Sequence, residues 1–373
     1  MENWWAVADE MALFLNLSQI HGIGPARIRT LLNRFAKPSK IVSASIDELT
    51  KIGGINESAA HAIQSAESAD FGLDQLQKAV DQNCQILACF DNRYPEKLKR
   101  IPNPPLVLYT TGQISVFNSF AIAIVGTRLP TAYGKNITIK LTRELVESGV
   151  TIVSGLARGI DTIAHTETVK YGGQTMAVLG SGLDVLYPSE NKKLASEICK
   201  NGLLVTEFAF GTKPDAINFP KRNRIISGLT AGTVVTEAGE KSGALITAYQ
   251  ALDQNREVFA VPGSIFSKNH AGPNQLIKEG AKLVTSVADI FDELPQQGDL
   301  FSPVNSGKMD AMRFSNNEKE IIDLLKDGEH HIDKLSRVLN KSTPALLSML
   351  LKLELEGVVQ QQPGKIFVLN KTF

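Results

Sequence analysis

Apolar runs alternate with amphipathic segments through the middle of the chain. Between these runs, apolar residues recur at helical spacing over residues 134–148, 159–171, 190–200 and 243–253. The short runs, rich in β-branched residues, are FAIAIVG (120–126), VTIVSG (150–155), TMAVLG (175–180), GLLVTEF (202–208), GTVVTEA (232–238) and EVFAVPG (257–263). Strands that are apolar throughout and separated by helices indicate a parallel sheet covered on both faces. The pattern predicts a doubly wound, mostly parallel, Rossmann-like α/β domain over residues 76–295, which begins with a strand, a proline-bearing crossing and a second strand at 82–112.

Residues 1–75 have the pattern of a helical domain with two glycine turns. HGIGPARIRTLL (21–32) and IGGINESAAHAI (52–63) each place glycine between apolar residues and then continue at helical spacing, as a helix-hairpin-helix motif does. In that motif the backbone N–H groups of the turn can approach a phosphate. A plain scaffold needs the same glycines where φ is positive. Arg27 and Arg29 leave DNA contact open for the first hairpin, whereas Glu57 disfavours it for the second.

The C-terminal part has the pattern of a winged-helix domain. A polar stretch rich in glycine and proline predicts a linker at 296–312, and residues 313–373 give three amphipathic helices and a short hairpin. The third helix of such a domain often enters a DNA groove. Here that helix, 343–356, carries the single cation Lys352 beside Glu354 and Glu356. This charge pattern favours protein contact or packing over DNA reading.

Composition adds few constraints. Lys plus Arg and Asp plus Glu number 39 each, so a polyanion would have to be bound by a local patch. Three cysteines without a C-x-x-C pair disfavour disulfides and structural zinc and fit a reducing compartment. The chain has no run of about 18 apolar residues and no N-terminal signal pattern. We therefore expect a cytoplasmic protein that has no metal, no cofactor and no contact with membranes.

The loops that follow the predicted strands are rich in glycine. They are GTR (126–128), SGLARGID (154–161), GSGLDVLYP (180–188), EAGEKSG (237–243) and VPG (261–263). In a doubly wound sheet, ligands bind at the carboxyl ends of the strands, and glycine lets backbone N–H groups approach a phosphate. The sequence lacks the spacing of a dinucleotide fingerprint, of a Walker A loop and of a nucleophile elbow. His165 is interpreted as a structural histidine and not as a catalytic base.

A basic segment, NFPKRNRIISG (218–228), lies between these loops in the sequence. Together with Arg128 and Arg158 from other strand ends, its cations would line one groove. Cations, glycine N–H groups and an occasional aromatic ring are what sequence-neutral single-strand binding needs. For Arg222 and Arg224 the alternative is a buried pair with Asp161, Glu207 or Glu237 that holds the loops in place. Tyr187 and Pro188 are expected to shape their turn and not to stack on a base.

These loops, in this order and followed by GPNQLIKEGA (272–281), closely resemble those of the DprA/Smf family of DNA-processing proteins. The resemblance implies a bacterial protein of natural transformation (competence) and DNA recombination that binds and protects incoming single-stranded DNA and loads the RecA recombinase. It also implies a homodimer formed through the Rossmann-like domain and no catalytic activity. Among the motif residues, the resemblance assigns the DNA pocket to Arg128, the loop 154–161 and the segment 221–224.

The candidate DNA-binding residues, from the pattern and the resemblance together, are Gly126, Arg128, Ser154, Gly155, Arg158, Gly159, Lys192, Lys193, Phe219, Lys221, Arg222, Arg224 and Gly243. The sequence departs from the family pattern at one position. Ser189 follows Pro188, where related proteins often have a lysine. Lys192 or Lys193, one helical turn later, would supply that charge.

One alternative from a different class is an enzyme. TAGTVVTEAG (230–239) resembles a loop of nucleotide phosphoribohydrolases of the lysine-decarboxylase-like group, which cleave the N-glycosidic bond of nucleoside monophosphates. In that interpretation Glu237 would stabilise the developing sugar cation, and Arg128 or Arg224 would hold the phosphate. Those enzymes carry a P-G-G-x-G-T run, and residues 229–233 (LTAGT) lack both the proline and the glycine pair.

Overall fold

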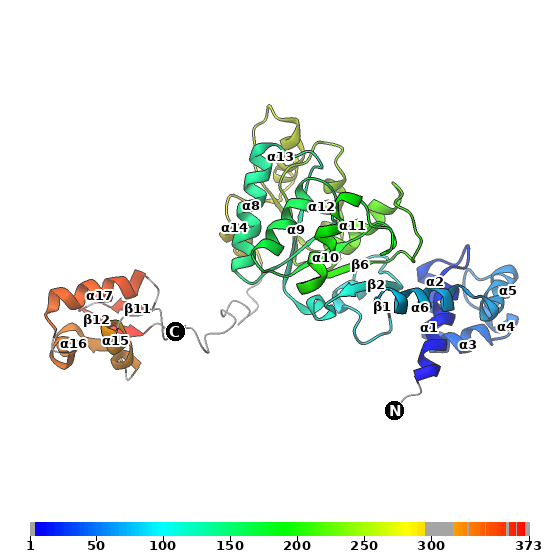
Figure 1. Ribbon diagram of the computed structural model, residues 1–373, viewed down its shortest axis with the longest axis horizontal. Coiled ribbons are helices and arrows are strands. Elements are labelled where there is room, and N and C mark those ends of the chain that lie inside the picture. Colours follow the sequence, from blue (N-terminus) through cyan, green and yellow to red (C-terminus); the bar gives the residue numbers. More distant parts are fainter. Residues whose placement is uncertain are drawn as a thin grey trace. The chain divides into compact units, whose positions relative to one another are not determined.

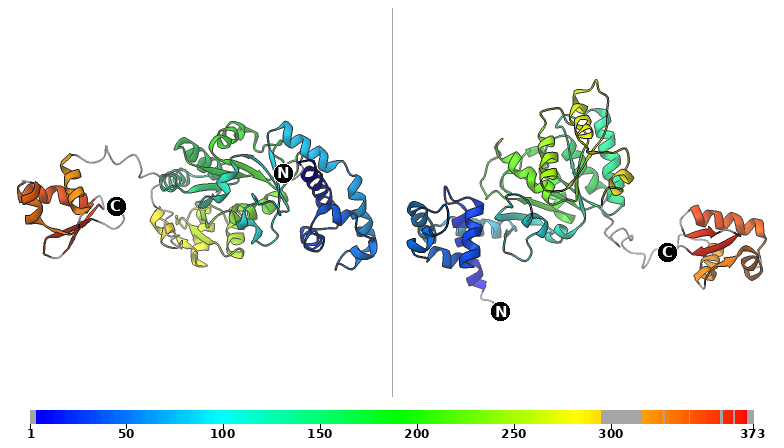
Figure 2. Two further views of the ribbon diagram at one scale, coloured as in Figure 1. Left: turned by 90° about the horizontal axis from the view of Figure 1, so that it is seen from below. Right: turned by 180° about the vertical axis from the view of Figure 1, so that it is seen from behind.

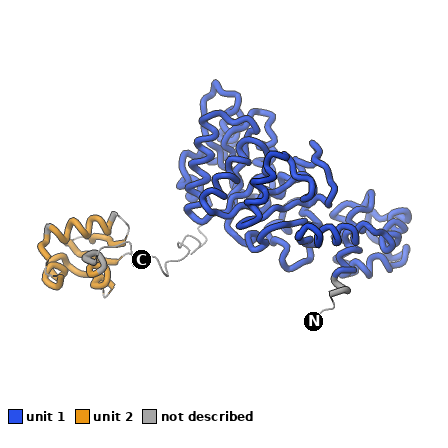
Figure 3. Tube along the Cα trace, in the orientation of Figure 1, with its two compact units in different colours: residues 1–301 blue, residues 302–373 orange. Residues whose placement is uncertain are grey.

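The structure, a computed structural model, describes residues 4–294, 316–326, 328–339, 341–355, 358–362 and 364–369. The chain forms two compact units, residues 1–301 and 302–373 (Figure 3). The predicted linker 296–312 lies outside the described residues. No helix in the described ranges is long and apolar enough to cross a membrane.

In the described part of the first unit, nine strands form one sheet in the order β1-β2-β6-β5-β4-β3-β7-β8-β9. Strands β3 to β9 run parallel to one another, and β1 and β2 form an antiparallel edge. Their bounds are β1 (Gln85–Ala88), β2 (Val107–Gly112), β3 (Ala121–Val125), β4 (Thr151–Ser154), β5 (Thr175–Val178), β6 (Leu203–Thr206), β7 (Gly232–Val235), β8 (Glu257–Ala260) and β9 (Lys282–Leu283). The predicted doubly wound sheet is confirmed.

Helices cover both faces of this sheet (Figures 1 and 2). One layer contains α8 (Ala132–Glu147), α9 (Ile160–Lys170), α10 (Lys192–Asn201) and α14 (Val287–Phe291), and the other contains α7 (Glu96–Lys99), α11 (Asn218–Gly228), α12 (Gly243–Asp253) and α13 (Ala271–Lys278). The central strand β3 shows why the runs are apolar throughout. Ile122 and Ile124 join the core under α8 and α9, while Ala121, Ala123 and Val125 join the core under α11 and α12. Successive side chains thus point to opposite faces, and both faces are buried.

The N-terminal helices are α1 (Trp4–Ser18), α2 (Pro25–Phe35), α3 (Pro38–Val42), α4 (Ile46–Thr50), α5 (Glu57–Ser65) and α6 (Phe71–Asp81). The two glycine turns fall between α1 and α2 and between α4 and α5, and Gly22 and Gly54 both have φ of +83°. This is the left-handed region that favours glycine. The two hairpins predicted from the sequence are present.

The arginines of the first hairpin are used within the first unit. Arg29 donates a hydrogen bond to the carbonyl of Pro104, outside the helical domain. Arg27 donates to the carbonyl of Gly22 at 2.7 Å, and its guanidinium lies against Gly54. These contacts support the scaffold interpretation of this hairpin.

The second unit contains α15 (Asn316–Lys326), α16 (Ile332–Leu339) and α17 (Thr343–Leu355). Its sheet has the order β10-β12-β11, with β10 (His330–His331), β11 (Val359–Gln362) and β12 (Ile366–Leu369), and all its pairs are antiparallel. Apolar residues from each helix and from the hairpin form one core, including Ile321, Leu335, Leu350 and Phe367. The predicted winged-helix arrangement is confirmed.

His165 of α9 is a buried structural residue next to the end of β4. Its side chain is fully buried, and Nδ1 lies 2.7 Å from the hydroxyl of Thr175. That hydroxyl already donates its hydrogen to the carbonyl of Ile152 at 2.7 Å, so Nδ1 carries the proton and donates to it. Burial lowers the pKa of His165 from its ordinary value of 6.5 to about 3.

Gln75 of α6 connects the helical domain to the sheet domain. It is 1% exposed, and its Oε1 accepts a hydrogen bond from the backbone N–H of Phe210 at 2.8 Å. Phe210 belongs to the segment between β6 and α11. The helical domain therefore helps to fix the segment that leads into the basic helix.

Replacing Gln75 by Ala should lower the free energy of unfolding by about 2 kcal/mol, because the buried N–H of Phe210 loses its acceptor. Gln77→Ala is the matched control, since this amide lies exposed on the same helix and bonds Asp81. Urea unfolding of both full-length variants, followed by circular dichroism, measures the difference. Equal midpoints for the two variants would contradict this role of Gln75.

His165 makes stability depend on pH. Because its folded pKa lies below the unfolded value, the unfolded chain binds more protons between about pH 3 and 6.5, so stability falls as the pH drops through this window. Between pH 6.5 and 5 the loss should be about 2 kcal/mol. In His165→Asn this part of the pH dependence should vanish, whereas the exposed His61→Asn should keep it. Urea unfolding at a series of pH values tests this, and an unchanged slope in His165→Asn would sink it.

Candidate nucleic-acid interface

A pocket lies where the central parallel strands end. Strands β3, β4 and β5 are neighbours in the sheet, so the loops that follow them meet at one rim. The pocket is lined by Arg128, Gly155, Ala157, Arg158, Gly180, Tyr187, Pro188 and Phe219. We call this the Phe219 pocket. The structure thus brings Arg128, Arg158 and Phe219 together, although they come from three separate segments of the chain.

Aromatic rings and guanidinium groups alternate in the Phe219 pocket. The Arg128 guanidinium lies 5.5 Å from the centre of the Phe219 ring, and the Phe219 and Tyr187 ring centres are 6.0 Å apart. The Arg158 guanidinium lies 6.0 Å from the centre of the Tyr187 ring. Arg128, Arg158 and Tyr187 are exposed, and Phe219 is half-buried. The arrangement gathers two cations and two aromatic rings around one pocket.

Tyr187 also lines the Phe219 pocket, although it was not among the candidate residues. This residue is 38% exposed, and its ring lies against that of Phe219. The loop that carries it is fixed from below, because Asn191 donates to the carbonyl of Leu156 at 2.9 Å and to the hydroxyl of Thr162 at 2.8 Å. The sequence offered one signal for this position: Tyr187 is an aromatic residue in the loop after β5, and β5 is the neighbour of β4, which leads into the loop 154–161.

Several candidate glycines are explained by contacts between the loops. A Cβ on Gly180 would lie 2.8 Å from the Phe219 ring. A Cβ on Gly126 would lie 2.5 Å from Ile160, and one on Gly159, whose φ is +80°, would lie 2.3 Å from the carbonyl oxygen of Thr127. Each distance is shorter than any normal contact, so glycine allows the loops to approach one another.

Arg222 lies inside the protein and not along the groove. It is 5% exposed, and its Nη1 donates to the backbone carbonyls of Gly155 and Val178. The prediction that Arg222 lines an open groove is therefore wrong, because its donors are directed into the ends of β4 and β5. Burial lowers its pKa to about 10, and the charge of Asp161 opposes that shift. Arg222 stays protonated at neutral pH.

The buried acid near Arg222 organises the loop 154–161. Asp161 accepts hydrogen bonds from the backbone N–H groups of Gly155 at 3.1 Å and Ala157 at 3.4 Å. Burial raises its pKa, while the Arg222 charge and these two N–H groups lower it. Ser154 is also buried and donates to the carbonyl of Ile124 at 2.6 Å. Ser154 and the N–H of Gly155 are therefore engaged within the fold and do not face the groove.

Arg224 pairs with Glu207, as the alternative interpretation of this residue proposed. The side chains of both residues are largely buried, with 16% and 17% exposure. Burial raises the pKa of Glu207, and Arg224 opposes the shift. Within the basic segment, Lys221 is the cation that remains exposed. The three cations of the basic segment thus separate into one exposed lysine and two arginines that have partners inside the protein.

The remaining candidates lie around the rim. Lys192 and Lys193 are exposed at the start of α10, one turn after Pro188. Arg158 pairs with the exposed Glu190, and because water screens an exposed pair of this kind, the guanidinium stays available to another partner. Gly243 begins α12 behind the N-cap Ser242 and lies outside the Phe219 pocket.

Glu237 is not placed as the enzyme alternative requires. It is fully buried, and its carboxylate accepts from both the backbone N–H, at 2.9 Å, and the hydroxyl of Thr131. A Cβ on Gly134 would lie 2.3 Å from this carboxylate group. Both oxygens thus hold the start of α8, and neither faces a pocket that could take a ribose. The phosphoribohydrolase interpretation is not favoured.

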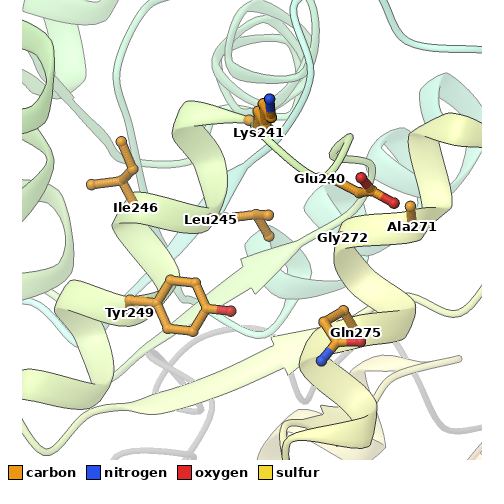
Figure 4. Close-up of a pocket in the computed structure, with 9 residues that line it drawn as sticks. Glu240, Lys241, Leu245, Ile246, Tyr249, Ala271, Gly272 and Gln275 are labelled. Atoms are coloured by element: carbon orange, nitrogen blue, oxygen red, sulfur yellow. The ribbon is translucent and has the colours of Figure 1, made fainter.

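A second, larger cavity of about 340 Å³ lies between α12 and α13 (Figure 4). Its lining is Glu240, Lys241, Ser242, Leu245, Ile246, Tyr249, Ala271, Gly272 and Gln275. The Tyr249 hydroxyl donates to Glu279 at 2.9 Å across the gap between the two helices. This cavity has an apolar floor and lacks the paired cations and rings of the Phe219 pocket.

Three family models match the chain. Residues 85–295 match the model of DNA recombination-mediator protein A, residues 14–66 match a SAM-like helix-hairpin-helix tandem, and residues 312–365 match the DprA winged-helix domain. The first of these models spans more than half of the chain. The three matches follow the order of the helical, sheet and winged-helix parts.

Curated proteins and solved structures agree with these matches. Protein Smf of Synechocystis is 34% identical over 95% of this chain and 98% of its own length. DNA processing protein DprA of Bacillus subtilis is 47% identical over 58% of this chain and 73% of its own length. The structure of DprA from Streptococcus pneumoniae superposes with a TM-score of 0.67 at 34% identity, covering 77% of this chain and 98% of that chain.

A solved structure of DNA processing protein A from Helicobacter pylori, which describes that protein's mode of binding single-stranded DNA, superposes with a TM-score of 0.51. It is 30% identical and covers 56% of this chain and 94% of that chain. The motifs of the strand-end loops, the three matched domains and these relatives lead to one conclusion. The chain belongs to the DprA/Smf family of DNA-processing proteins.

Proposed function

We propose that the chain binds single-stranded DNA at the Phe219 pocket without sequence preference and without a catalytic step. The observation that carries the proposal is the alternation of Arg128, Phe219, Tyr187 and Arg158 around one pocket at the strand ends. Unpaired bases offer ring faces that a duplex hides, and the backbone offers phosphates. The pocket provides a partner for each.

In this proposal the rings and cations have separate tasks. Bases stack on Phe219 and Tyr187, and such stacking contributes about 1–3 kcal/mol per base. Arg128, Arg158 and Lys221 contact phosphates, with Lys192 and Lys193 as further contacts beside the third loop. The pocket lining contains no Asp, Glu, Asn, Gln, Ser or Thr side chain that would read a base edge, and its two arginines are assigned to phosphates. Binding is therefore expected to depend on charge and stacking and not on base identity.

Buried candidates act through the loops. Arg222, Ser154 and Gly155 hold the ends of β3, β4 and β5 together, and Arg224 fixes the segment after β6 through Glu207. Gly126 and Gly159 allow the first two loops to approach one another. Gly243 stays a proposed DNA contact at the N-terminus of α12, beyond the pocket.

The biological part of the proposal follows from family membership. We infer that the chain acts in the bacterial cytoplasm during natural transformation, where it protects incoming single strands and loads RecA onto them. The single-strand binding described for the Helicobacter pylori relative supports the choice of DNA form. RecA-dependent strand exchange on DNA already covered by single-strand-binding protein is the assay, and no stimulation by this chain would overturn the loading role.

In this proposal the Phe219 pocket binds DNA and catalyses no reaction. Glu237, the acid that an N-glycosidase would need, has both carboxylate oxygens engaged with Thr131. Release of free base when the purified chain is incubated with adenosine monophosphate would overturn this part of the proposal.

A homodimer is proposed through the α12 side of the sheet domain. Ile246, Tyr249 and Leu252 recur every three residues along α12 and are 40%, 42% and 50% exposed. These three side chains form an apolar stripe, and two of them, Ile246 and Tyr249, line the cavity in Figure 4. A contiguous apolar surface of this kind marks an interaction site. In a two-fold dimer the same surface of each copy meets, so the stripe of one copy would bury that of the other.

Arg128→Ala should weaken binding to single-stranded oligonucleotides of every sequence about equally. Losing one phosphate contact should also flatten the dependence of log K on log salt by about 0.7. Arg143→Ala is the matched control, because Arg143 also lies 5.5 Å from an aromatic ring, that of Tyr171, but on the distal part of α8. Fluorescence anisotropy across a salt series measures both variants. Unchanged affinity and slope for Arg128→Ala would remove the Phe219 pocket from the DNA path.

Placing a charge on the α12 stripe should separate the proposed dimer. In Ile246→Glu/Leu252→Glu, association would bury two carboxylates per subunit, which costs several kcal/mol and shifts the chain to monomer. Sedimentation velocity at several concentrations measures the state. Leu73→Glu/Val80→Glu on the exposed side of α6 is the control. A dimer that persists in the α12 variant would rule out this stripe as the interface.

A further inference from the structure

The rim beyond the Phe219 pocket carries exposed apolar side chains. Leu129, in the loop after β3, is 83% exposed, and Ile265 and Phe266, in the loop after β8, are 84% and 92% exposed. These three residues are called the Phe266 patch. No other large apolar side chain among the described residues is exposed above 80%. Side chains that are this exposed bury no surface in the core, so core packing does not account for their being apolar.

Hydrogen bonds connect the two loops of the patch. Asn269 donates from its side chain to the carbonyl of Leu129 at 3.2 Å, and the Tyr133 hydroxyl donates to the carbonyl of Pro262 at 2.9 Å. The loops are therefore one surface, although about 140 residues separate them in the sequence. The Phe266 patch has a fixed base and exposed side chains at its tip.

The charges on these loops are of one sign. The loop after β3, residues 126–131, contains Arg128 and no carboxylate, and the loop after β8, residues 261–270, contains Lys268 and no carboxylate. A surface that combines cations, an aromatic ring and aliphatic side chains without acids suits a polyanion with accessible apolar faces. An unpaired nucleic-acid strand has this chemistry, and a duplex does not, because its bases are stacked on one another.

The patch also adjoins the Phe219 pocket. Leu129 directly follows Arg128, whose guanidinium lies over the Phe219 ring. The carbonyl of Leu129 in turn accepts the hydrogen bond of Asn269, which belongs to the second loop. This continuity selects the strand already held in the pocket as the occupant of the patch.

We propose that the Phe266 patch is a second contact for the same DNA strand. Bases next to those in the Phe219 pocket stack on Phe266 and lie against Ile265 and Leu129, while Lys268 contacts the backbone. The inference rests on the proposed single-strand binding and extends it by assigning a longer path and a reason for preferring unpaired DNA. Sequence motifs did not indicate this contact, because SIFSKN (264–269) has no glycine pattern.

The test compares the length dependence of binding. Oligothymidylates of about 5 and about 20 nucleotides span the range from one pocket to an extended path. Ile265→Ala/Phe266→Ala in the full chain should lose about tenfold in affinity for the longer strand and keep the wild-type affinity for the shorter one. Arg128→Ala should lose affinity for both. Leu73→Ala/Val80→Ala, which removes two exposed apolar side chains from α6, should change neither affinity.

The outcomes separate this inference from the function on which it rests. Wild-type affinity of the double variant for both lengths would overturn the second contact alone, and so would an equal loss for both lengths. Absence of binding by the wild type to either strand would overturn the proposed function as well. A shift of the double variant from dimer to monomer in sedimentation velocity would instead assign the patch to a second copy of the chain and overturn the inference.

A fluorescent substitution gives an independent readout. In Phe266→Trp, the additional tryptophan emission relative to the wild type should be quenched by the longer oligothymidylate and not by the shorter one, because stacking on a base quenches indole. An emission that does not respond to the longer strand would contradict stacking at this position.

Discussion

A buried guanidinium holds the candidate site together. Arg222 donates to the carbonyls of Gly155 and Val178, which lie at the ends of two adjacent strands, and Asp161 holds the N–H of Gly155 from the other side. The loop glycines leave space for these groups, since a Cβ on Gly155 would lie 2.3 Å from Nη1 of Arg222. A buried charge is tolerated only with partners, and here backbone carbonyls and a nearby carboxylate provide them. The rim loops, and with them Arg128 and Phe219, depend on this arrangement.

Three arginines of the same region show how surroundings determine the role of one residue type. Arg128 is exposed and lies over a ring, Arg222 is buried among carbonyls, and Arg224 is paired with Glu207. The guanidinium group suits all three, because it is planar, always charged at neutral pH and rich in donors. Only the exposed one is free to meet a phosphate. The two internal ones fix the geometry in which it is presented.

The surface of the sheet domain carries two chemically different regions. The strand-end rim carries cations and aromatic rings around the Phe219 pocket, whereas α12 carries apolar side chains, two of which line the cavity of Figure 4. A strand of DNA and a protein partner would therefore use different helices of the same domain. The helical domain supports the sheet domain, because Gln75 accepts a hydrogen bond from the backbone of Phe210 and Arg29 donates one to the carbonyl of Pro104.

The sequence by itself determined the sheet domain, the helix-hairpin turns, the winged-helix unit and the family. Apolar runs such as AIAIV (121–125) predict central strands because both faces of such a strand are buried. Gly22 and Gly54 predict the two turns because a positive φ favours glycine. Only the tertiary structure decided which cations face solvent. Lys221, Arg222 and Arg224 are near neighbours in the chain. Arg222 lies about 100° around the helix from Lys221 and points into the fold, whereas Arg224 lies only about 60° from Lys221 and is covered where it pairs with Glu207. The contacts of Tyr187 with Phe219 and of Leu129 with Asn269 could not be read from the sequence either, because each pair joins segments whose distance depends on how the strands are ordered in the sheet.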